Sequence, residues 1–401
     1  MMGSIKRGFR VASATIAIFL AGWIARADTT PLDPLENPGF QHFYNLEYDE
    51  ALADFTAQAA KNPTLPDAYN HIAQTILFRQ MFRSGALESD LIAAGNSFLR
   101  RPKMVFSAAD EKQFSSAIGR ALDLSQTRLK SEPNDTAALY ALGVSRGIRA
   151  NYNFMVKKFV DALGDASAAR KLHLRVLDLN PKFIDAQLIP GLDEYVVSSL
   201  PWGWKMLGTV AGLPGDRDEG IRMLTVVAQN GRNDRYDAEA LLTAIYRREK
   251  RPAEAIAPLN ELIRNFPRSF LLRIELAEMY GDLGARDKAM AALDELEQMR
   301  RSGAPGYERL PQAKIHYTRG NLLFLFNDLD RALEELKAAT GADSGLSATT
   351  AGTAWLRTGQ VYDLKRQRPQ ALEAYRRAVN IVPDSDVADQ AKGYIFSRYK
   401  R

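Results

Sequence analysis

The sequence predicts an all-α chain made of stacked pairs of helices. An alanine is followed twelve residues later by a proline at five places: Ala51–Pro63, Ala121–Pro133, Ala169–Pro181, Ala255–Pro267 and Ala371–Pro383. Between alanine and proline, apolar residues recur at the i, i+3, i+4 and i+7 spacing of an amphipathic helix. Proline then ends the helix, because its ring clashes with the preceding turn and it has no backbone N–H. The repeated spacing indicates one structural unit that recurs along the chain.

A second helix precedes the alanine, and its pattern is clearest near the C-terminus. In order, that copy contains Trp355, Thr358, Gly359, Tyr362, Ala371, Tyr375 and Pro383. The pattern resembles the tetratricopeptide repeat (TPR), in which W-x2-L-G-x2-Y, A-x3-F and P follow one another over about 34 residues. Ala255 and Ala289 are 34 residues apart, the length of one such repeat. The resemblance implies a right-handed α-solenoid of TPR-like helix-turn-helix repeats.

This register divides most of the chain into helix pairs. Pairs are expected near residues 39–63, 66–133, 136–181, 184–232, 236–267, 270–301, 313–344 and 352–383. The more regular TPR array covers residues 236–383, and residues 39–235 hold divergent pairs with insertions at 79–107 and 195–213. Residues 384–401 are expected to form an amphipathic capping helix, because a solenoid needs a polar outer face at its end.

The first residues have the layout of a secretory signal peptide. A basic start is followed by an apolar run of 14 residues, Val11 to Ile24, and then by Ala25-Arg26-Ala27. We expect residues 1–27 to be a signal peptide cleaved after Ala27. An uncleaved anchor is the alternative, although a membrane span needs about 20 apolar residues. Residues 28–38 are rich in proline and predict a tether, so we expect an exported protein of the bacterial periplasm or outer cell envelope.

Composition excludes several kinds of site. The chain has 401 residues, no cysteine and four scattered histidines, so neither a thiolate metal site nor an imidazole cluster is expected. Four basic residues and no acidic residue precede Asp28, and the remaining chain has 49 basic and 48 acidic residues. This near balance argues against a nucleic-acid partner. No cofactor is expected either.

The inner face of a TPR superhelix is formed mainly by the first helix of each pair, and it is the usual surface for a partner. In the predicted register, the residues most suited to a partner segment are Tyr140, Tyr317, Asn321, Phe324 and Gln360. They indicate a groove lined by apolar and amide side chains, without a cluster of cations. We therefore expect a protein partner.

The insertion at 195–213 is unusually apolar, because Lys205 is its one charged residue. Its proline and glycines argue against a membrane-spanning helix. Trp202 and Trp204 form an apolar patch that fits a membrane interface or a partner, whereas a buried connection between repeats explains the same composition. With the basic residues Arg100, Arg101 and Lys103, this patch supports an alternative function as a peripheral membrane or lipid-interacting protein.

Catalytic motifs are absent from the sequence. It contains no G-x-S-x-G, G-x-x-x-x-G-K-[ST], G-x-G-x-x-G or H-E-x-x-H segment. An enzyme would need an unrecognised site made by the insertions 79–107 and 195–213 together. The favoured hypothesis is a non-enzymatic protein-protein interaction scaffold that binds a partner segment in the groove of a TPR superhelix.

Overall fold

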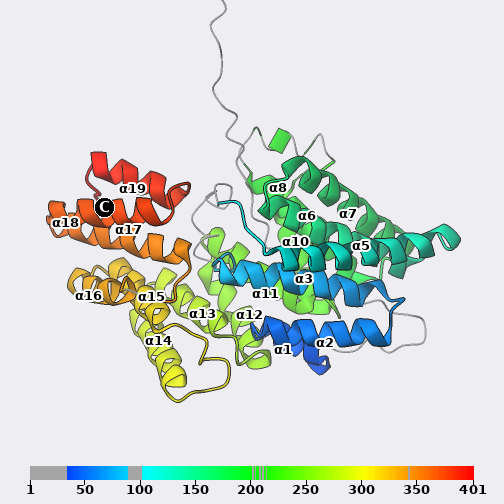
Figure 1. Cartoon of the computed structure of the whole chain (residues 1–401), viewed down its shortest axis with the longest axis horizontal. Helices are drawn as coiled ribbons and strands as arrows, with labels where there is room; N and C mark the ends of the chain where they lie inside the picture. The colour runs from blue at the N-terminus through cyan, green and yellow to red at the C-terminus, as the bar shows by residue number, and fades with distance from the viewer. Residues whose placement is uncertain are drawn as a thin grey trace, which may run out of the picture.

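The computed structural model describes residues 34–88, 102–200, 203, 205–206, 209, 212–213, 215–341 and 344–401. The expected signal peptide lies outside the described residues, as does the first half of the expected tether. In the described part of the chain, all regular secondary structure is helical. The predicted fold class, an all-α solenoid, is confirmed (Figure 1).

Four helix pairs make up the N-terminal half. After a short 3-10 helix, η1 (Pro34–Glu36), they are α1 (Pro38–Tyr44) with α2 (Tyr48–Lys61), α3 (Pro66–Arg83) with α5 (Ala108–Ser131), α6 (Thr136–Met155) with α7 (Phe159–Leu179), and α8 (Leu188–Ser199) with α10 (Arg217–Asn230). A second 3-10 helix, η3 (Ile184–Gln187), leads into α8.

The C-terminal half contains four more pairs. They are α11 (Arg235–Arg248) with α12 (Pro252–Asn265), α13 (Phe270–Asp282) with α14 (Arg286–Arg301), α15 (Gln312–Leu325) with α16 (Leu329–Ala339), and α17 (Ala348–Leu364) with α18 (Arg368–Ile381). The helix α19 (Asp386–Phe396) packs on α17 and α18 at the end of the array, in the segment where a capping helix was expected.

The alanines of the repeat lie at the contact between the paired helices. All five of them, Ala51, Ala121, Ala169, Ala255 and Ala371, are fully buried. The fourth pair has Gly220 at this position. A Cβ atom there would lie 2.6 Å from the backbone nitrogen of Tyr195 and 2.7 Å from the carbonyl oxygen of Gly191. The helices α8 and α10 therefore cross too closely for alanine, which explains this departure from the repeat.

The two helices of most pairs are joined by the same turn. One residue in the left-handed conformation lies two positions after the first helix, and these residues are Leu46, Lys157, Lys250, Gly284, Asn327 and Arg366. The next backbone N–H then donates to a carbonyl in the last turn of the first helix, as Ala285 does to Tyr280 at 2.9 Å. This is the Schellman arrangement, which satisfies carbonyls at the helix end.

The insertions begin later than the sequence predicted. The helix α3 continues to Arg83, and Gly85 then forms the same left-handed turn, so the extra residues lie between that turn and α5. Residues 195–199 likewise belong to α8. The fold also begins inside the expected tether, because Pro34 is buried and the side chain of Asn37 accepts a hydrogen bond from the backbone of Gly39 at the start of α1.

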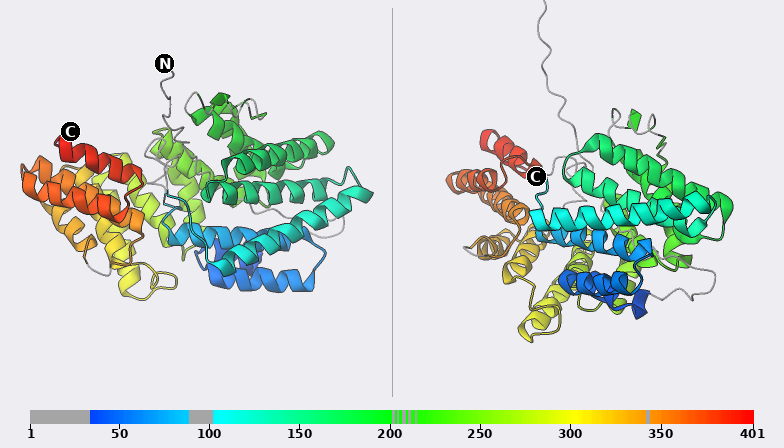
Figure 2. Two further views of the ribbon diagram at one scale, coloured as in Figure 1. Left: turned by 45° about the horizontal axis from the view of Figure 1, so that its top comes forward. Right: turned by 45° about the vertical axis from the view of Figure 1, so that its right-hand side comes forward.

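The first pair packs against the fifth, although the two are far apart in the sequence (Figure 2). The ring centroids of Tyr44 and Phe266 are 4.5 Å apart, and the Tyr44 hydroxyl donates to Asp237 at 2.8 Å. The guanidinium of Arg268 pairs with Glu47 at 2.7 Å. One continuous core of buried side chains extends from the first pair to α15. The first helices of the first and fifth pairs, α1 and α11, are therefore packed together.

Gly284 and Gly119 provide a matched test of the turn. A Cβ atom at either position would meet no atom within 4 Å, but Gly284 has a φ of +74° and Gly119 lies inside α5. Gly284→Ala should lower the free energy of unfolding by about 1 kcal/mol because of backbone strain alone. Gly119→Ala should raise it by about 0.5 kcal/mol. Urea titrations of both variants measure the difference, and equal effects would contradict the role of the turn.

Candidate functional site

Tyr140 lies in the interior and does not reach the surface. Its side chain is fully buried, and its hydroxyl donates a hydrogen bond to Asp234 at the start of α11. Its ring centroid lies 4.9 Å from that of His173 and 4.8 Å from that of Phe183. The residue therefore holds α6 against α11 and its own paired helix α7. A contact between Tyr140 and a partner stays a prediction.

The surroundings of Tyr140 are a buried polar network. Asp185 accepts hydrogen bonds from the backbone N–H groups of Arg232, Asn233 and Asp234, at 3.0 to 3.1 Å. Burial and the nearby carboxyls of Asp185 and Asp237 hold the pKa of Asp234 well above its usual range. These contacts fix the start of α11 against η3 and α6, so the network stabilises the packing of the third and fourth pairs against the fifth.

Tyr317 is also buried, and its ring lies next to an ion pair between distant parts of the chain. The ammonium of Lys314 lies 5.1 Å from the Tyr317 ring centroid and 2.5 Å from the Glu88 carboxylate. The Thr350 hydroxyl donates to the same carboxylate at 3.1 Å. The segment that follows α3 therefore contacts the first turns of α15 and α17.

The other three predicted residues surround one cation that the sequence analysis missed. The guanidinium of Arg357 donates to Asn321 Oδ1 at 3.0 Å and to Gln360 Oε1 at 2.9 Å. Its central carbon lies 4.3 Å from the centroid of the Phe324 ring. Phe324 and Gln360 are buried, whereas Arg357 and Asn321 are partly exposed. Arg357 thus joins α15 to α17 through neutral partners.

Residues 397–401, here called the C-terminal tail, contact the same ring. The guanidinium of Arg401 lies 4.7 Å from the Phe324 centroid and donates to Asn327 Oδ1 at 2.7 Å. The backbone N–H of Tyr399 donates to Asp363 Oδ2 at 2.9 Å. We call Asn321, Phe324, Arg357, Gln360 and Arg401 the Arg357 cluster.

The cluster has an excess of positive charge. Among the described residues, no side-chain carboxylate forms an ion pair with Arg357 or Arg401, whose polar side-chain partners are Asn321, Gln360 and Asn327. Other cations on first helices differ in this respect, because Lys314 of α15 pairs with Glu88, and Arg247 of α11 pairs with Glu278. A half-buried guanidinium with neutral partners keeps its full charge available to an anion.

Arg357 was not among the residues predicted for this face, although Gln360, three positions later on α17, was. The Arg357 side chain reaches Asn321 of α15. A shift of one residue rotates a helical face by about 100°, so the repeat pattern alone did not single out Arg357. The pair Arg357 and Gln360, three positions apart, is the signal that a finer register would have used.

The two tryptophans of the apolar patch, Trp202 and Trp204, lie outside the described residues. Elsewhere in that insertion, Tyr195 and Val197 are buried within α8, Leu213 is buried, and Met206 is half exposed. Of the three basic residues named with the patch, Arg100 and Arg101 also lie outside, and Lys103 is exposed.

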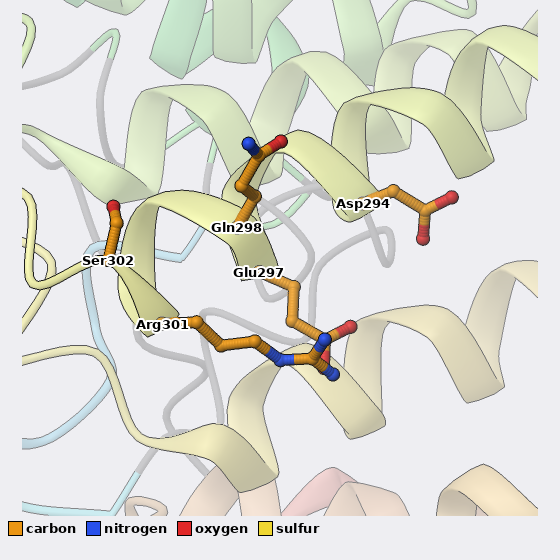
Figure 3. A pocket seen from close by; sticks show the side chains of 5 residues that line it. All are labelled: Asp294, Glu297, Gln298, Arg301 and Ser302. Atoms are coloured by element: carbon orange, nitrogen blue, oxygen red, sulfur yellow. The ribbon is translucent and has the colours of Figure 1, made fainter.

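A hollow lies along α14. It is lined by Asp294, Glu297, Gln298, Arg301 and Ser302, which all belong to this helix or its C-terminal end (Figure 3). Arg319 of α15 pairs with Glu297 at 2.7 Å and with Asp294 at 3.1 Å. The carboxylates of the hollow are therefore already neutralised by the chain's own cations.

The described residues form neither a metal site nor a membrane-spanning helix. No group of histidine and acidic residues in the described ranges is arranged to hold a metal ion. Nor does any described helix have the length and apolar character that crossing a membrane requires.

Comparisons with known proteins identify no family. No family model matches the chain, and no curated protein matches it. Among solved structures, the chain is similar to the Cut9–Hcn1 hetero-tetramer of the APC/C, with 14% identity, a TM-score of 0.49 and coverage of 90% of this chain and 54% of that one. This chain therefore spans about half the length of its counterpart.

Two other solved structures show a similar degree of likeness. Human IFIT1 with m7Gppp-AAAA has 14% identity and a TM-score of 0.45, with coverage of 90% of this chain and 84% of that one. A tetratricopeptide repeat protein from Parabacteroides merdae has 14% identity and a TM-score of 0.31, with coverage of 80% and 97%. None of these similarities assigns a ligand to the chain.

Asp363 should be the main anchor of the C-terminal end. Its carboxylate is fully buried and accepts hydrogen bonds from Arg368, the Tyr375 hydroxyl and the Tyr399 backbone, at 2.9 to 3.0 Å. Asp363→Ala leaves a guanidinium without its carboxylate and should lower the free energy of unfolding by about 3 kcal/mol. Amide hydrogen exchange should also speed up in α19 and the tail.

Glu373→Ala is the control for this prediction, because Glu373 forms an exposed ion pair with Arg377 in the same helix pair. It should cost less than about 1 kcal/mol. Equal destabilisation by the two variants, measured by urea unfolding, would show that Asp363 is no anchor.

Asp193 predicts a pH dependence of stability. Burial raises its pKa to about 8, while Arg170 lowers it and Glu194 raises it. Between the unfolded and folded pKa values, only the folded state holds this proton, so rising pH lowers the free energy of unfolding. Between pH 5 and pH 8, ionisation of Asp193 should lower the free energy of unfolding by on the order of 3 kcal/mol. Asp193→Asn should remove this decrease.

Urea unfolding at pH 5 and pH 8 measures the effect, with Asp218→Asn as the control because Asp218 is exposed. The loss between the two pH values should persist in the control. An equal loss in Asp193→Asn would exclude Asp193 as its source.

Proposed function

We propose that this chain is a non-enzymatic protein-protein interaction scaffold that binds a partner segment along the first helices of its last pairs. The observation that carries this proposal is the Arg357 cluster, in which partly exposed hydrogen-bond donors from α15 and α17 lie beside an aromatic ring. A polar row of this kind fixes the position of a bound segment, while apolar contacts supply much of its affinity.

The packing of the first five pairs favours the same location. There the first helices meet one another, as Tyr140 of α6 and Asp234 at the start of α11 do, and Tyr44 of α1 and Asp237 of α11. The last two pairs have smaller, separate cores in addition. On their first helices, Asn321 and Arg357 are partly exposed, and we propose that a second protein contacts them.

We further propose that the protein is exported and acts in the bacterial periplasm or at the outer cell envelope. The support is the N-terminal sequence, with its basic start, short apolar run and Ala25-Arg26-Ala27. A chain without cysteine folds there without needing oxidation.

The alternative is a peripheral membrane protein that uses the apolar insertion. The exposed side chains of Met206 and Lys205, next to Trp202 and Trp204 in the sequence, favour this function. An apolar residue beside a cation suits the interface of an anionic membrane.

Photo-crosslinking in cells distinguishes the two functions. A benzoylphenylalanine at position 353 lies one helical turn before Arg357, and a second probe at position 202 reports on the insertion. We expect one dominant protein adduct from position 353, identified by mass spectrometry, and none from position 373, an exposed site on α18. Adducts only from position 202, or only with lipid, would contradict the scaffold and support the membrane function.

A further inference from the structure

The Arg357 cluster presents hydrogen-bond donors in excess of acceptors. A guanidinium only donates, so the oxygens of Asn321 and Gln360 must face Arg357, and their amide nitrogens point elsewhere. In the described part of the chain, the hydrogen bonds of these two amides within the cluster are made by their oxygens and not by their nitrogens. A guanidinium carries five N–H groups, and Arg357 uses two of them on Asn321 and Gln360. The cluster therefore has more hydrogen-bond donors than acceptors, and a ligand that supplies acceptors would complement it.

The charges around the cluster have the same sign. Arg401 lies on the same aromatic ring as Arg357, and its polar partners are the Phe324 carbonyl and Asn327. The other two cations of the C-terminal tail, Arg398 and Lys400, are exposed. The buried carboxylate of Asp363, three positions after Gln360, is paired with Arg368 at 3.0 Å. The local field thus attracts an anion.

We propose that the Arg357 cluster binds the carboxylate of an aspartate or glutamate side chain on a partner protein. This inference rests on the proposed function and names the chemistry of its partner. The planar guanidinium, held against the Phe324 ring, presents its remaining N–H groups to a carboxylate in the paired geometry that arginine favours. The amide nitrogens of Asn321 and Gln360 supply further donors, and Arg401 supplies a second cation.

The structure also argues for a single acidic residue on a peptide rather than for a polyanion. The cluster spans two neighbouring helices and the C-terminal tail, and Lys314, on the same helix α15, is already paired with Glu88. A nucleic acid needs a longer row of free cations to neutralise successive phosphates. A short acidic segment needs only this one site, with apolar neighbours for the rest of its length.

A random dodecapeptide library displayed on phage tests the proposal. The bait is the chain without residues 1–27. Each peptide is joined to the coat protein through its C-terminus, so that side chains are the source of its carboxylates. We expect the selected peptides to be enriched in aspartate and glutamate. By fluorescence anisotropy, the strongest peptide should lose roughly tenfold in affinity when its acidic residue becomes the amide, and as much with Arg357→Gln.

Asn321→Asp is the sharper variant, because it places a carboxylate of the chain itself beside Arg357. The protein should remain folded and at least as stable as the wild type, yet lose the selected peptides. Arg264→Gln is the control, since Arg264 is exposed on α12 and pairs with Glu261. That variant should bind as the wild type does.

Four outcomes would overturn the inference: no selected peptides, peptides without an acidic excess, unchanged binding by Arg357→Gln and Asn321→Asp, or binding only by peptides with a free C-terminal carboxylate. These failures differ from failure of the scaffold. If position 353 still crosslinks one protein while both variants bind peptides normally, the scaffold stands and the carboxylate site does not.

Discussion

The close approach of the two helices in each pair depends on positions that have no room for a larger side chain. A Cβ atom on Gly359 would lie 2.4 Å from the ring of Tyr375, and one on Gly143 would lie 2.2 Å from the ring of His173. The large residue of the second helix thus occupies the space that the small residue leaves. Where a pair has this contact, its two helices pack closely, and such pairs can stack on one another.

Stacking alone would leave the first helices open on one side, and the first five pairs close this space with their own side chains. The closure uses polar contacts across long distances in the sequence, such as that between the Arg268 backbone and Asn45 at 2.8 Å. Buried polar groups stabilise one arrangement over others because a misplaced partner leaves them unsatisfied. These contacts stabilise the first five pairs, and the proposed binding belongs to the pairs beyond them.

This division explains what the sequence could predict. The helix pairs follow from a packing pattern repeated within about 34 residues, so their approximate ranges could be read from alanine, glycine and proline positions. The surroundings of Tyr140 and Tyr317 could not be read in this way. Tyr140 donates to Asp234, and Lys314, which lies against the Tyr317 ring, pairs with Glu88, so both contacts join residues far apart in the chain. Arg357 was missed for a different reason: a helical face changes with a shift of one residue, and the spacing of the repeat does not resolve that shift.

On the first helices, the kind of partner that a cation has distinguishes a structural role from a binding role. Lys314 and Arg247 form ion pairs with carboxylates of the chain. Their charge is thereby neutralised, and each pair connects one helix or segment to another. Arg357 meets two amide oxygens and a ring, which orient the guanidinium without neutralising it. Holding a charge in position with neutral groups lowers the ordering cost of binding an anion and preserves the attraction. The amides that position Arg357 do so through their oxygens, so in the proposed complex their nitrogens supply the further donors.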